Sequence, residues 1–396
     1  MLASENECTG CSVCSVNCPQ NCIKMIEDEQ GFYYPHIDES SCIHCGRCEK
    51  ICPVINLENV RHEETICYCA QNTDDEIRTA SSAGGVAGAI ADHVISQNGI
   101  IYACGFTANN TVKFYRIQNH EEIEKYKVLG SKYVSSQLHM IVSQIVEDVI
   151  ANRQVCFIGL PCQVAAIKKL TGDERKNLLL IDLTCYGAPS SKVYENYLCS
   201  CEEKYKSKIK RVNFRDKTYG YSATSMTMTF EDGKTRGQNS FIKSYLRAYF
   251  SNLICRKACY DCKFKTINRV SDITIGDFRS VWRFVSEFDD DKGTTVMYIH
   301  TSKGMEVLNE IQRYMRITRV SVEDVLHTDG KKMINSMEKN QNRDNFFQVM
   351  NNHSYTEAVK TYCPPKSSEY LANILKTMLR LFGLNHSGLL KTIKRR

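Results

Sequence analysis

The sequence lacks a long apolar run: no stretch of about 18 consecutive apolar residues occurs in its 396 residues, so no membrane-spanning helix is predicted. Its start, MLASENECTGCSVC, has no basic segment followed by an apolar one, so no signal peptide is predicted either. The net charge of +6 is not gathered into a dense basic stripe, which argues against nucleic-acid binding. With 42% hydrophobic and 24% charged residues, the chain is expected to be a folded cytoplasmic protein.

Histidine-based catalytic sets are missing as well. The ten histidines are scattered and no Ser-His-Asp or Cys-His combination stands out, so the sequence assigns no catalytic residue. Cysteine, by contrast, is abundant, with 21 residues. Thiols stay reduced in the cytoplasm, and an odd number fits a disulfide framework poorly, so the clustered cysteines predict metal or redox sites.

Eight cysteines near the start form two copies of one motif, CTGCSVCSVNCP from Cys8 and CIHCGRCEKICP from Cys42. Both follow C-x2-C-x2-C-x3-C-P, a run typical of bacterial ferredoxins, in which the fourth cysteine of each run ligates the other [4Fe–4S] cluster. One cluster is therefore expected on Cys8, Cys11, Cys14 and Cys52, and the second on Cys42, Cys45, Cys48 and Cys18. Zinc sites normally show paired ligands and are a weaker alternative.

The residues between the two motifs predict a small α+β domain. CIKMIEDEQGFYYPHID alternates apolar and polar residues around a glycine, as two short strands would. Cys22 lies outside the motif and is expected to be a small apolar filler. Residues 1–60 are thus predicted to form a ferredoxin-like dicluster domain that conducts electrons.

Beyond this domain, buried strands alternate with helices, which predicts a larger α/β domain with a mostly parallel sheet. QVCFIGLPCQVAAIKKL and NLLLIDLTCYGAPSSKVYENYL are each typical of a strand, a turn and a helix. Cys162 and Cys185 follow these two strands, at the sheet edge where α/β domains bind ligands. Each alone would be interpreted as a buried cysteine, but their matched positions favour a shared site.

A glycine-rich turn precedes a helix in SSAGGVAGAIADHVISQNGIIYACGF, residues 81–106. Ser81 and Ser82 suit a helix N-cap, and Gly84 and Gly85 allow close approach of a ligand, so a phosphate could sit at this helix start. A simple packing turn is an equally good interpretation. Downstream, SATSMTMTFEDGKTRG predicts a hairpin, and ICRKACYDCKF adds three cysteines, two of them in a C-x2-C loop.

The motifs SSAGGVAGAI, LGSKYVSS, FIGLPCQVAAIK, IDLTCYGAPS, CRKACYDCKF, SDITIGDF and DKGTTVMYIHTSKG occur in the order expected of the beta subunit family of coenzyme F420-reducing hydrogenases and dehydrogenases. The resemblance covers residues 65–305. It implies a domain with FAD and an iron–sulfur cluster that passes electrons between iron–sulfur chains and a hydride carrier. The fusion to a dicluster ferredoxin resembles a bacterial branch found beside polysaccharide-biosynthesis genes. One departure is Arg279, where the family pattern has tryptophan; Trp282 follows three positions later.

The resemblance also implies site residues. Those expected near FAD are Ser82, Gly84, Gly85, Lys132, Tyr133, Asp272 and Asp277. Those expected to hold a third [4Fe–4S] cluster are Cys162, Cys185, Cys259 and Cys262. Cys255 competes for one corner, but Cys259 and Cys262 have the spacing of one loop, whereas Cys255 lies a helical turn earlier.

The predicted function is that of an iron–sulfur flavoprotein oxidoreductase, which passes electrons between ferredoxin-type clusters and, through FAD, a hydride carrier or organic substrate. The carrier could be F420-like or a nicotinamide, and the substrate an intermediate of surface polysaccharide biosynthesis. Two alternatives stay open: a non-catalytic electron-transfer subunit that feeds a partner enzyme, and a zinc-binding scaffold. A ferredoxin or another redox protein is the expected partner.

Residues 306–396 are predicted to form a helical C-terminal extension. GMEVLNEIQRYM and SVEDVL have the pattern of helices that cover the sheet. The tail YLANILKTMLRLFGLNHSGLLKTIKRR is amphipathic and basic, and such a helix could lie on a membrane surface. A packing or partner helix is the favoured interpretation of this tail.

Overall fold

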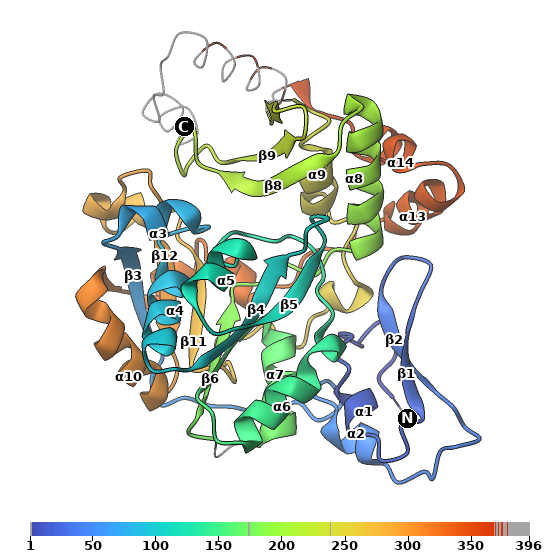
Figure 1. The fold of residues 1–396 in the computed structure, drawn as a ribbon, viewed down its shortest axis with the longest axis vertical. Coiled ribbons are helices and arrows are strands. Elements are labelled where there is room, and N and C mark those ends of the chain that lie inside the picture. The colour runs from blue at the N-terminus through green and yellow to red at the C-terminus, as the bar shows by residue number, and fades with distance from the viewer. Residues whose placement is uncertain are drawn as a thin grey trace.

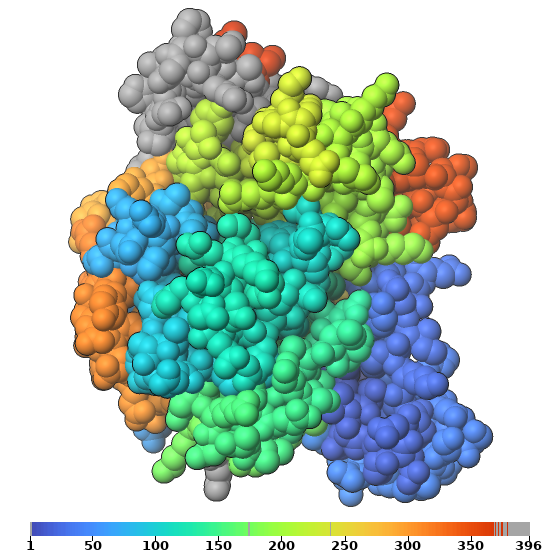
Figure 2. Space-filling view, viewed as in Figure 1, coloured from blue at the N-terminus to red at the C-terminus, as the bar shows by residue number. Residues whose placement is uncertain are grey.

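The fold places a small N-terminal domain against the flank of a larger body (Figure 1). A computed structural model describes residues 2–172, 175–237 and 239–367, and the single positions 369, 371, 374 and 378. Within these residues no helix is long and apolar enough to cross a membrane. In the space-filling view the N-terminal domain, in blue, packs directly beside the main body (Figure 2).

The N-terminal domain repeats its local backbone as well as its cysteine motif. Helices α1, Val13–Val16, and α2, Arg47–Ile51, each begin between the second and third cysteine of a run. Ser12, with φ 69°, and Gly46, with φ 70°, precede these helices at equivalent positions, so both runs turn in the same left-handed way. The predicted antiparallel hairpin consists of β1, Ile23–Glu27, and β2, Tyr33–Ile37.

The main body is built on an eight-stranded mixed sheet with the order β13-β3-β12-β11-β7-β6-β4-β5. Its strands are β3, Ile66–Asn72, β4, Ile100–Phe106, β5, Val112–Ile117, β6, Val155–Gly159, β7, Leu178–Leu183, β11, Ile273–Asp277, β12, Thr295–Ile299, and β13, Met315–Val320. The predicted parallel arrangement is found at the centre, in β4, β6, β7 and β11. The outer strands pair antiparallel; β5, for example, returns directly after β4 as a hairpin, which needs no crossover helix.

Helices cover both faces of this sheet. Helices α4, Val86–Ser96, and α10, Ser302–Ile311, pack apolar side chains on one face. Helices α6, Val142–Ile150, and α7, Pro161–Thr171, cover the other. Each methylene buried in these layers contributes about 0.8 kcal/mol, so the two layers stabilise the sheet and hold its strand ends in place. Shorter helices α3, Asp75–Ala80, and α5, His120–Lys125, lie at its edges.

A smaller, three-stranded sheet packs beside the main one, at the top of Figure 1. Its strands are β8, Ile209–Asp216, β9, Ser225–Phe230, and β10, Thr235–Arg236, of which the last two form the predicted hairpin. The helices packed around it are α8, Ser191–Tyr205, α9, Ser244–Phe250, α13, Arg343–Asn352, and α14, Tyr355–Tyr362. Their shared core is rich in tyrosine and phenylalanine.

Residues after 305 do not form the helical extension that was expected. Met315–Val320 form β13, which pairs with β3 at the sheet edge, so the main domain continues beyond its predicted end. The sequence MRITRV alternates in the manner of a strand, but it is short and lies between helical segments. Helices α11, Val322–Leu326, and α12, Lys331–Ile334, follow it. The basic tail, residues 370–396, lies outside the described residues except at positions 371, 374 and 378.

A buried carboxylate, that of Asp148, ties the β4-β5 hairpin to α6. It accepts hydrogen bonds from the Tyr102 hydroxyl at 2.5 Å, from Arg116 Nε at 2.7 Å and from Arg153 Nη1 at 2.6 Å. Burial alone would raise the pKa of Asp148, but the hydrogen bonds from Arg116 and Tyr102 lower it overall. Its contribution to stability is therefore present above the unfolded pKa of about 3.9 and is lost as the pH falls through the lower folded pKa.

Replacement of Asp148→Asn is expected to lower the free energy of unfolding at pH 7 by about 3 kcal/mol, because a buried charge network loses its anion. The difference from the unaltered protein should shrink as the pH falls below about 4. Arg153→Gln is the control, since the Arg153 side chain is 55% exposed and its pair should contribute less than about 1 kcal/mol. Anaerobic thermal unfolding at both pH values measures this, and equal losses in the two variants would contradict it.

Candidate iron–sulfur centres and cofactor cavity

The first group of N-terminal thiols combines the two cysteine runs. Cys8, Cys11 and Cys14 belong to the first run and Cys52 ends the second. Burial raises the pKa of Cys11 to about 11, and the neighbouring Cys8 and Cys52 thiols add to the rise. Burial also raises the pKa of Cys14, and the other three thiols of the group raise it further. The four ligands expected for one cluster therefore lie close together.

The second group, Cys18, Cys42, Cys45 and Cys48, is closer to solvent. Cys18, Cys42 and Cys48 pack together, whereas Cys45 is exposed. Cys22 lies inside this group, because its Sγ is 3.3 Å from that of Cys18. Cys22 is thus a buried side chain, as expected, and in addition a fifth thiol at this site.

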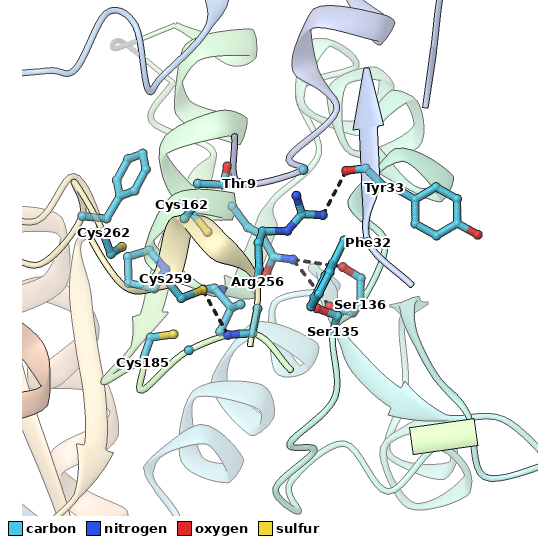
Figure 3. A pocket seen from close by; sticks show the side chains of 18 of the residues that line it. Thr9, Phe32, Tyr33, Ser135, Ser136, Cys162, Cys185, Arg256, Cys259 and Cys262 are labelled. Atoms are coloured by element: carbon cyan, nitrogen blue, oxygen red, sulfur yellow. Dashed lines mark hydrogen bonds between the residues drawn. The ribbon is translucent and has the colours of Figure 1, made fainter. Parts of the chain in front are cut away.

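The four cysteines expected to hold the third cluster line one cavity of about 60 Å³ (Figure 3). Cys162 is in the first turn of α7 and Cys185 follows β7. Cys259 and Cys262 come from the loop around the 3-10 helix η2, Lys257–Cys259. Burial raises the pKa of the Cys162 thiol well above its usual range, and the other three thiols raise it further. The structure thus brings together residues that the sequence separates widely.

Cys255 is not among the described residues that line this cavity. Its side chain is fully buried in the aromatic core of the smaller sheet, and its carbonyl oxygen accepts hydrogen bonds from Nε and Nη2 of Arg343 at 2.9 and 2.8 Å. Cys259 Sγ accepts a hydrogen bond from the Ala188 N–H at 3.3 Å. The geometry therefore favours Cys259 over Cys255 as the partner of Cys262.

Three cations, Arg256, Lys265 and Arg269, line the same cavity. Lys265 Nζ donates to the carbonyl oxygens of Cys185 and Lys332. Burial raises the pKa of Cys185 to about 12, whereas the Lys265 charge opposes this rise. Cations near the thiols favour the thiolate, which is the form that binds iron. Four thiols in a cationic cavity fit one [4Fe–4S] cluster.

The third cysteine group adjoins the first. Thr9 and Gly10 of the N-terminal domain line the four-cysteine cavity. The Cys11 thiol is close enough to Cys162 to add to the rise in its pKa. At its other side the first group packs against the second, because Cys14 and Cys18 share one buried cluster. The three groups therefore form a continuous series.

A larger cavity, of about 580 Å³, adjoins the four-cysteine cavity. The two share Leu160, Gln163 and residues 185–188 as lining. Ile158, Leu183 and Ile275 place the ends of β6, β7 and β11 at its wall, beyond the carboxyl ends of parallel strands, where ligands of α/β sheets are expected. Aromatic side chains complete the lining: Tyr133, Tyr186, Phe214, Tyr249 and Phe250.

Five of the seven residues expected near FAD line this larger cavity: Ser82, Gly85, Lys132, Tyr133 and Asp277. Gly84 instead packs against the sheet. Its N–H donates to Thr295 Oγ1 at 2.9 Å, and a Cβ at this position would lie 2.3 Å from the carbonyl oxygen of Ala70. Glycine is required there by the close approach of backbone, so Gly84 is a packing residue.

Asp272 is also not among the described lining residues of the larger cavity. It immediately precedes β11, whereas Asp277 ends that strand. Its Oδ2 accepts a hydrogen bond from the Leu180 N–H at 2.8 Å, and its Oδ1 accepts one from Thr301 Oγ1 at 2.7 Å. The structure therefore gives Asp272 a role in joining β7 to the start of α10, in place of the expected cofactor contact.

The N-cap of α4 is Gly85, and not Ser81 or Ser82 as expected. Gly85 has φ 88°, which glycine adopts without strain, and Ser81 instead ends α3. Ser82 Oγ donates to the Leu129 carbonyl oxygen at 3.3 Å and accepts from Ser131 Oγ at 2.7 Å. These bonds tie the helix start to the loop 128–134. Because the start of α4 lines the larger cavity, its free N–H groups favour an anion there.

Lys132 holds this loop in shape. Its Nζ donates to the carbonyl oxygens of Lys127, Val128 and Gly130 at 2.5, 2.6 and 2.8 Å. Burial lowers the pKa of Lys132 to about 7, whereas the three carbonyl acceptors favour its ammonium form. The expectation was a free counter-charge for a phosphate, but the structure shows a lysine that is used to form the cavity wall.

The sequence analysis missed a group of cations in the larger cavity. Arg215, Arg279 and Lys332 line it together with Asp277. Arg215 is 6% exposed and pairs with Asp277, while its Nε and Nη2 have no hydrogen-bond partner among the described residues. Arg279 was visible as a departure from the family pattern, but Arg215 gave no sequence signal because its partner lies on a different sheet.

Residues 7–56 match the family described as 4Fe-4S dicluster domain, and residues 152–325 match the family described as the C terminus of the coenzyme F420 hydrogenase/dehydrogenase beta subunit. The chain belongs to the coenzyme F420 hydrogenase/dehydrogenase beta subunit family, with a 4Fe-4S dicluster domain fused in front. The dicluster match contains all eight N-terminal motif cysteines, and the beta subunit match contains the four cysteines of the third group.

This member of the beta subunit family is 25% identical over 190 residues to the F component of the F(420)H(2) dehydrogenase of Methanosarcina mazei, which covers 45% of the chain and 53% of the relative. The chain thus spans about half the length of that relative. It is 43% identical over 63 residues to a 7Fe ferredoxin of Hydrogenibacillus schlegelii, covering 15% of the chain and 74% of the ferredoxin. A chain of the F420-reducing [NiFe] hydrogenase complex from Methanosarcina barkeri aligns with a TM-score of 0.48 and 18% identity, over 68% of this chain and 88% of that one.

These matches make the family member an iron–sulfur electron-transfer protein of the oxidoreductase type. The resemblance inferred from the sequence motifs is confirmed for both parts of the chain. The thiol groups described above supply the ligands that such a protein needs.

Proposed function

We propose that this chain is an FAD-containing iron–sulfur oxidoreductase that passes electrons between ferredoxin-type clusters and a hydride carrier or an organic substrate. One observation supports this most strongly: the four-cysteine cavity and the larger cavity share the wall formed by residues 185–188. A cluster on the four thiols and a cofactor in the larger cavity would therefore be neighbours.

The larger cavity fits a cofactor of this size. Its volume of about 580 Å³ falls in the range of about 300–1,000 Å³ that is usual for ligand and cofactor sites. Its aromatic and aliphatic walls suit a ring system, and the start of α4 at Gly85 suits a phosphate. The residues that would hold FAD are Ser82, Gly85, Lys132, Tyr133 and Asp277.

The cysteine groups define an order for the electron path. Cys45 is exposed and belongs to the second group, which packs against the first through Cys14 and Cys18. Cys11 then adjoins Cys162 of the third group, whose Cys185 also lines the larger cavity. Electrons would enter or leave through the second group and reach the larger cavity through the third.

When bound, a flavin supplies chemistry that exchanges electrons singly or in pairs. One hydride carries two electrons, so its exchange with the clusters needs two single-electron transfers and takes up or releases one proton. Arg215, Arg279 and Lys332 place more positive than negative charge around Asp277 at the cavity wall. An anionic carrier or substrate would be attracted there, which suits F420-like carriers, nicotinamide dinucleotides and phosphorylated sugar intermediates of surface polysaccharides alike.

The second candidate function is a subunit that only feeds electrons to a partner enzyme. It is favoured by the name of the Methanosarcina mazei relative, which is one component of a larger dehydrogenase. The exposed Cys45, beside Ile43 with 59% exposure, provides a surface close to the second group where such a partner could dock.

Anaerobic spectroscopy of the purified full chain distinguishes these functions. The oxidoreductase is expected to contain about twelve irons and one FAD, and its flavin absorbance should bleach with NADH, NADPH or reduced F420 alone. Bleaching that requires an added redox protein would favour the electron-transfer subunit. No flavin after purification and reconstitution with FAD would contradict the oxidoreductase proposal.

Replacement of Lys132→Met is expected to weaken FAD binding about tenfold or more, because the loop that forms the cavity wall loses three charge-assisted hydrogen bonds. Iron content should stay unchanged, since Lys132 lines only the larger cavity. Lys127→Met is the control, because Lys127 belongs to the same loop but its side chain is exposed. Fluorescence titration with FAD measures both, and equal affinities in the two variants would rule out the loop's role.

A further inference from the structure

Arg256 lies between the first and third cysteine groups. It precedes Cys259 by three positions in the segment ICRKACYDCKF. Its Nη1 donates to the Cys8 carbonyl oxygen at 3.1 Å, and its Nη2 donates to the Tyr33 carbonyl oxygen at 2.9 Å. The same side chain lines the four-cysteine cavity (Figure 3). One guanidinium therefore contacts both domains where two groups of thiols approach each other.

The surroundings of Arg256 hold it tightly. It is 5% exposed, and its guanidinium carbon lies 5.1 and 4.6 Å from the ring centroids of Phe32 and Tyr34. A Cβ on Gly10 would lie 2.5 Å from Arg256 Nη2, and Gly10 has φ +69°. Glycine is thus required where the N-terminal domain approaches the guanidinium.

Arg256 has no carboxylate partner in the part of the chain that the structure describes. A buried cation without an anion is costly, by several kcal/mol, unless negative charge lies close by. A [4Fe–4S] cluster on four thiolates is anionic, and such a cluster on either side would provide the missing negative charge. Lys257 and Lys263 of the same segment pair with Glu5 and Glu7 instead, at exposed positions where ion pairs contribute about 0–1 kcal/mol.

We propose that Arg256 is a positioning residue that fixes the N-terminal domain on the main body and raises the reduction potentials of the first and third clusters together. This rests on the proposed function, because it needs a cluster on each thiol group. Reduction adds one negative charge to a cluster, so a buried cation near both favours the reduced form of both. An electron that leaves one cluster then enters the other, without a proton or any further reactant.

Redox titration of the anaerobically purified full chain, followed by electron paramagnetic resonance, tests this proposal. In Arg256→Gln the potentials of the first and third clusters are expected to shift downward together, while that of the second cluster stays unchanged. Arg256→Lys keeps the charge but cannot donate in two directions, so both potentials should shift less. In this variant limited proteolysis should release the N-terminal domain faster.

Arg343→Gln is the matched control. Arg343 is as buried, with 0% exposure, and it donates to Cys255 in the same segment, but it is not among the described lining residues of the four-cysteine cavity. This variant is expected to lose stability without a change in any potential.

Unchanged potentials in Arg256→Gln with normal iron content would overturn the inference. If Arg256→Gln does not assemble, Gly10→Ala displaces the guanidinium and must shift the same two potentials; no shift in Gly10→Ala or Arg256→Lys would overturn the inference equally. An unaltered chain with only about eight irons would instead overturn the proposed function, because the third cluster would be missing.

Discussion

Cys259→Ser and Cys262→Ser chains, purified anaerobically, are expected to contain about eight irons in place of about twelve, because each variant removes one corner of the third cluster. The four thiols of this site come from three separate parts of the chain, so a missing ligand cannot be replaced from a neighbouring position. The two N-terminal clusters should remain, since their ligands lie in another domain. Iron analysis and electron paramagnetic resonance of the reduced protein measure the loss.

Cys255→Ser provides the control for this experiment. Cys255 lies in the same segment but is buried in the aromatic core, so iron content should stay at about twelve. A hydroxyl in this apolar core should lower the free energy of unfolding by about 1–3 kcal/mol. Loss of four irons in Cys255→Ser, with normal iron in Cys259→Ser, would reverse the assignment of the two residues.

Replacement of Asp277→Leu is expected to lower the free energy of unfolding by about 3 kcal/mol, because Arg215 becomes a buried charge without its anion. The Arg215 side chain is 4% exposed and that of Asp277 is 33% exposed. Burial alone would raise the pKa of Asp277, but Arg215 and Arg279 keep it below its usual value. The stabilisation is therefore present above an unfolded pKa of about 3.9 and is lost as the pH falls through the lower folded pKa.

The double variant Arg215→Met, Asp277→Leu separates charge from packing. It removes both partners of the pair that joins β8 of the smaller sheet to β11 of the main sheet, so it should recover most of the lost stability. Anaerobic unfolding in denaturant compares the single and double variants at pH 7. Equal stability of Asp277→Leu and the double variant would show that packing, and not the unpaired charge, causes the loss.

The local features of this molecule could be predicted from the sequence. The spacing of the N-terminal cysteine runs allowed their ligand sets to be inferred, because loop geometry there depends on neighbouring residues. Alternation around turn residues predicted both hairpins, β1-β2 and β9-β10. Strand-end positions indicated a shared site for Cys162 and Cys185, and family resemblance added Cys259 and Cys262.

Features that depend on contacts between distant segments could not be predicted. Arg256 contacts Cys8, 248 positions away, and Arg215 contacts Asp277, 62 positions away. An arginine in a loop or strand has no periodicity that indicates such a partner. Gly84 and Asp272 failed for the related reason that their contacts with Ala70 and Thr301 were unknown.

The segment ICRKACYDCKF has a consequence for the order in which the protein matures. It carries two expected ligands of the third cluster, and its Arg256, Lys257 and Lys263 contact the N-terminal domain. Insertion of iron into the main body and docking of the ferredoxin domain are therefore coupled steps. A chain that has not received its third cluster should hold the N-terminal domain loosely, which would make it recognisable to proteases as unfinished.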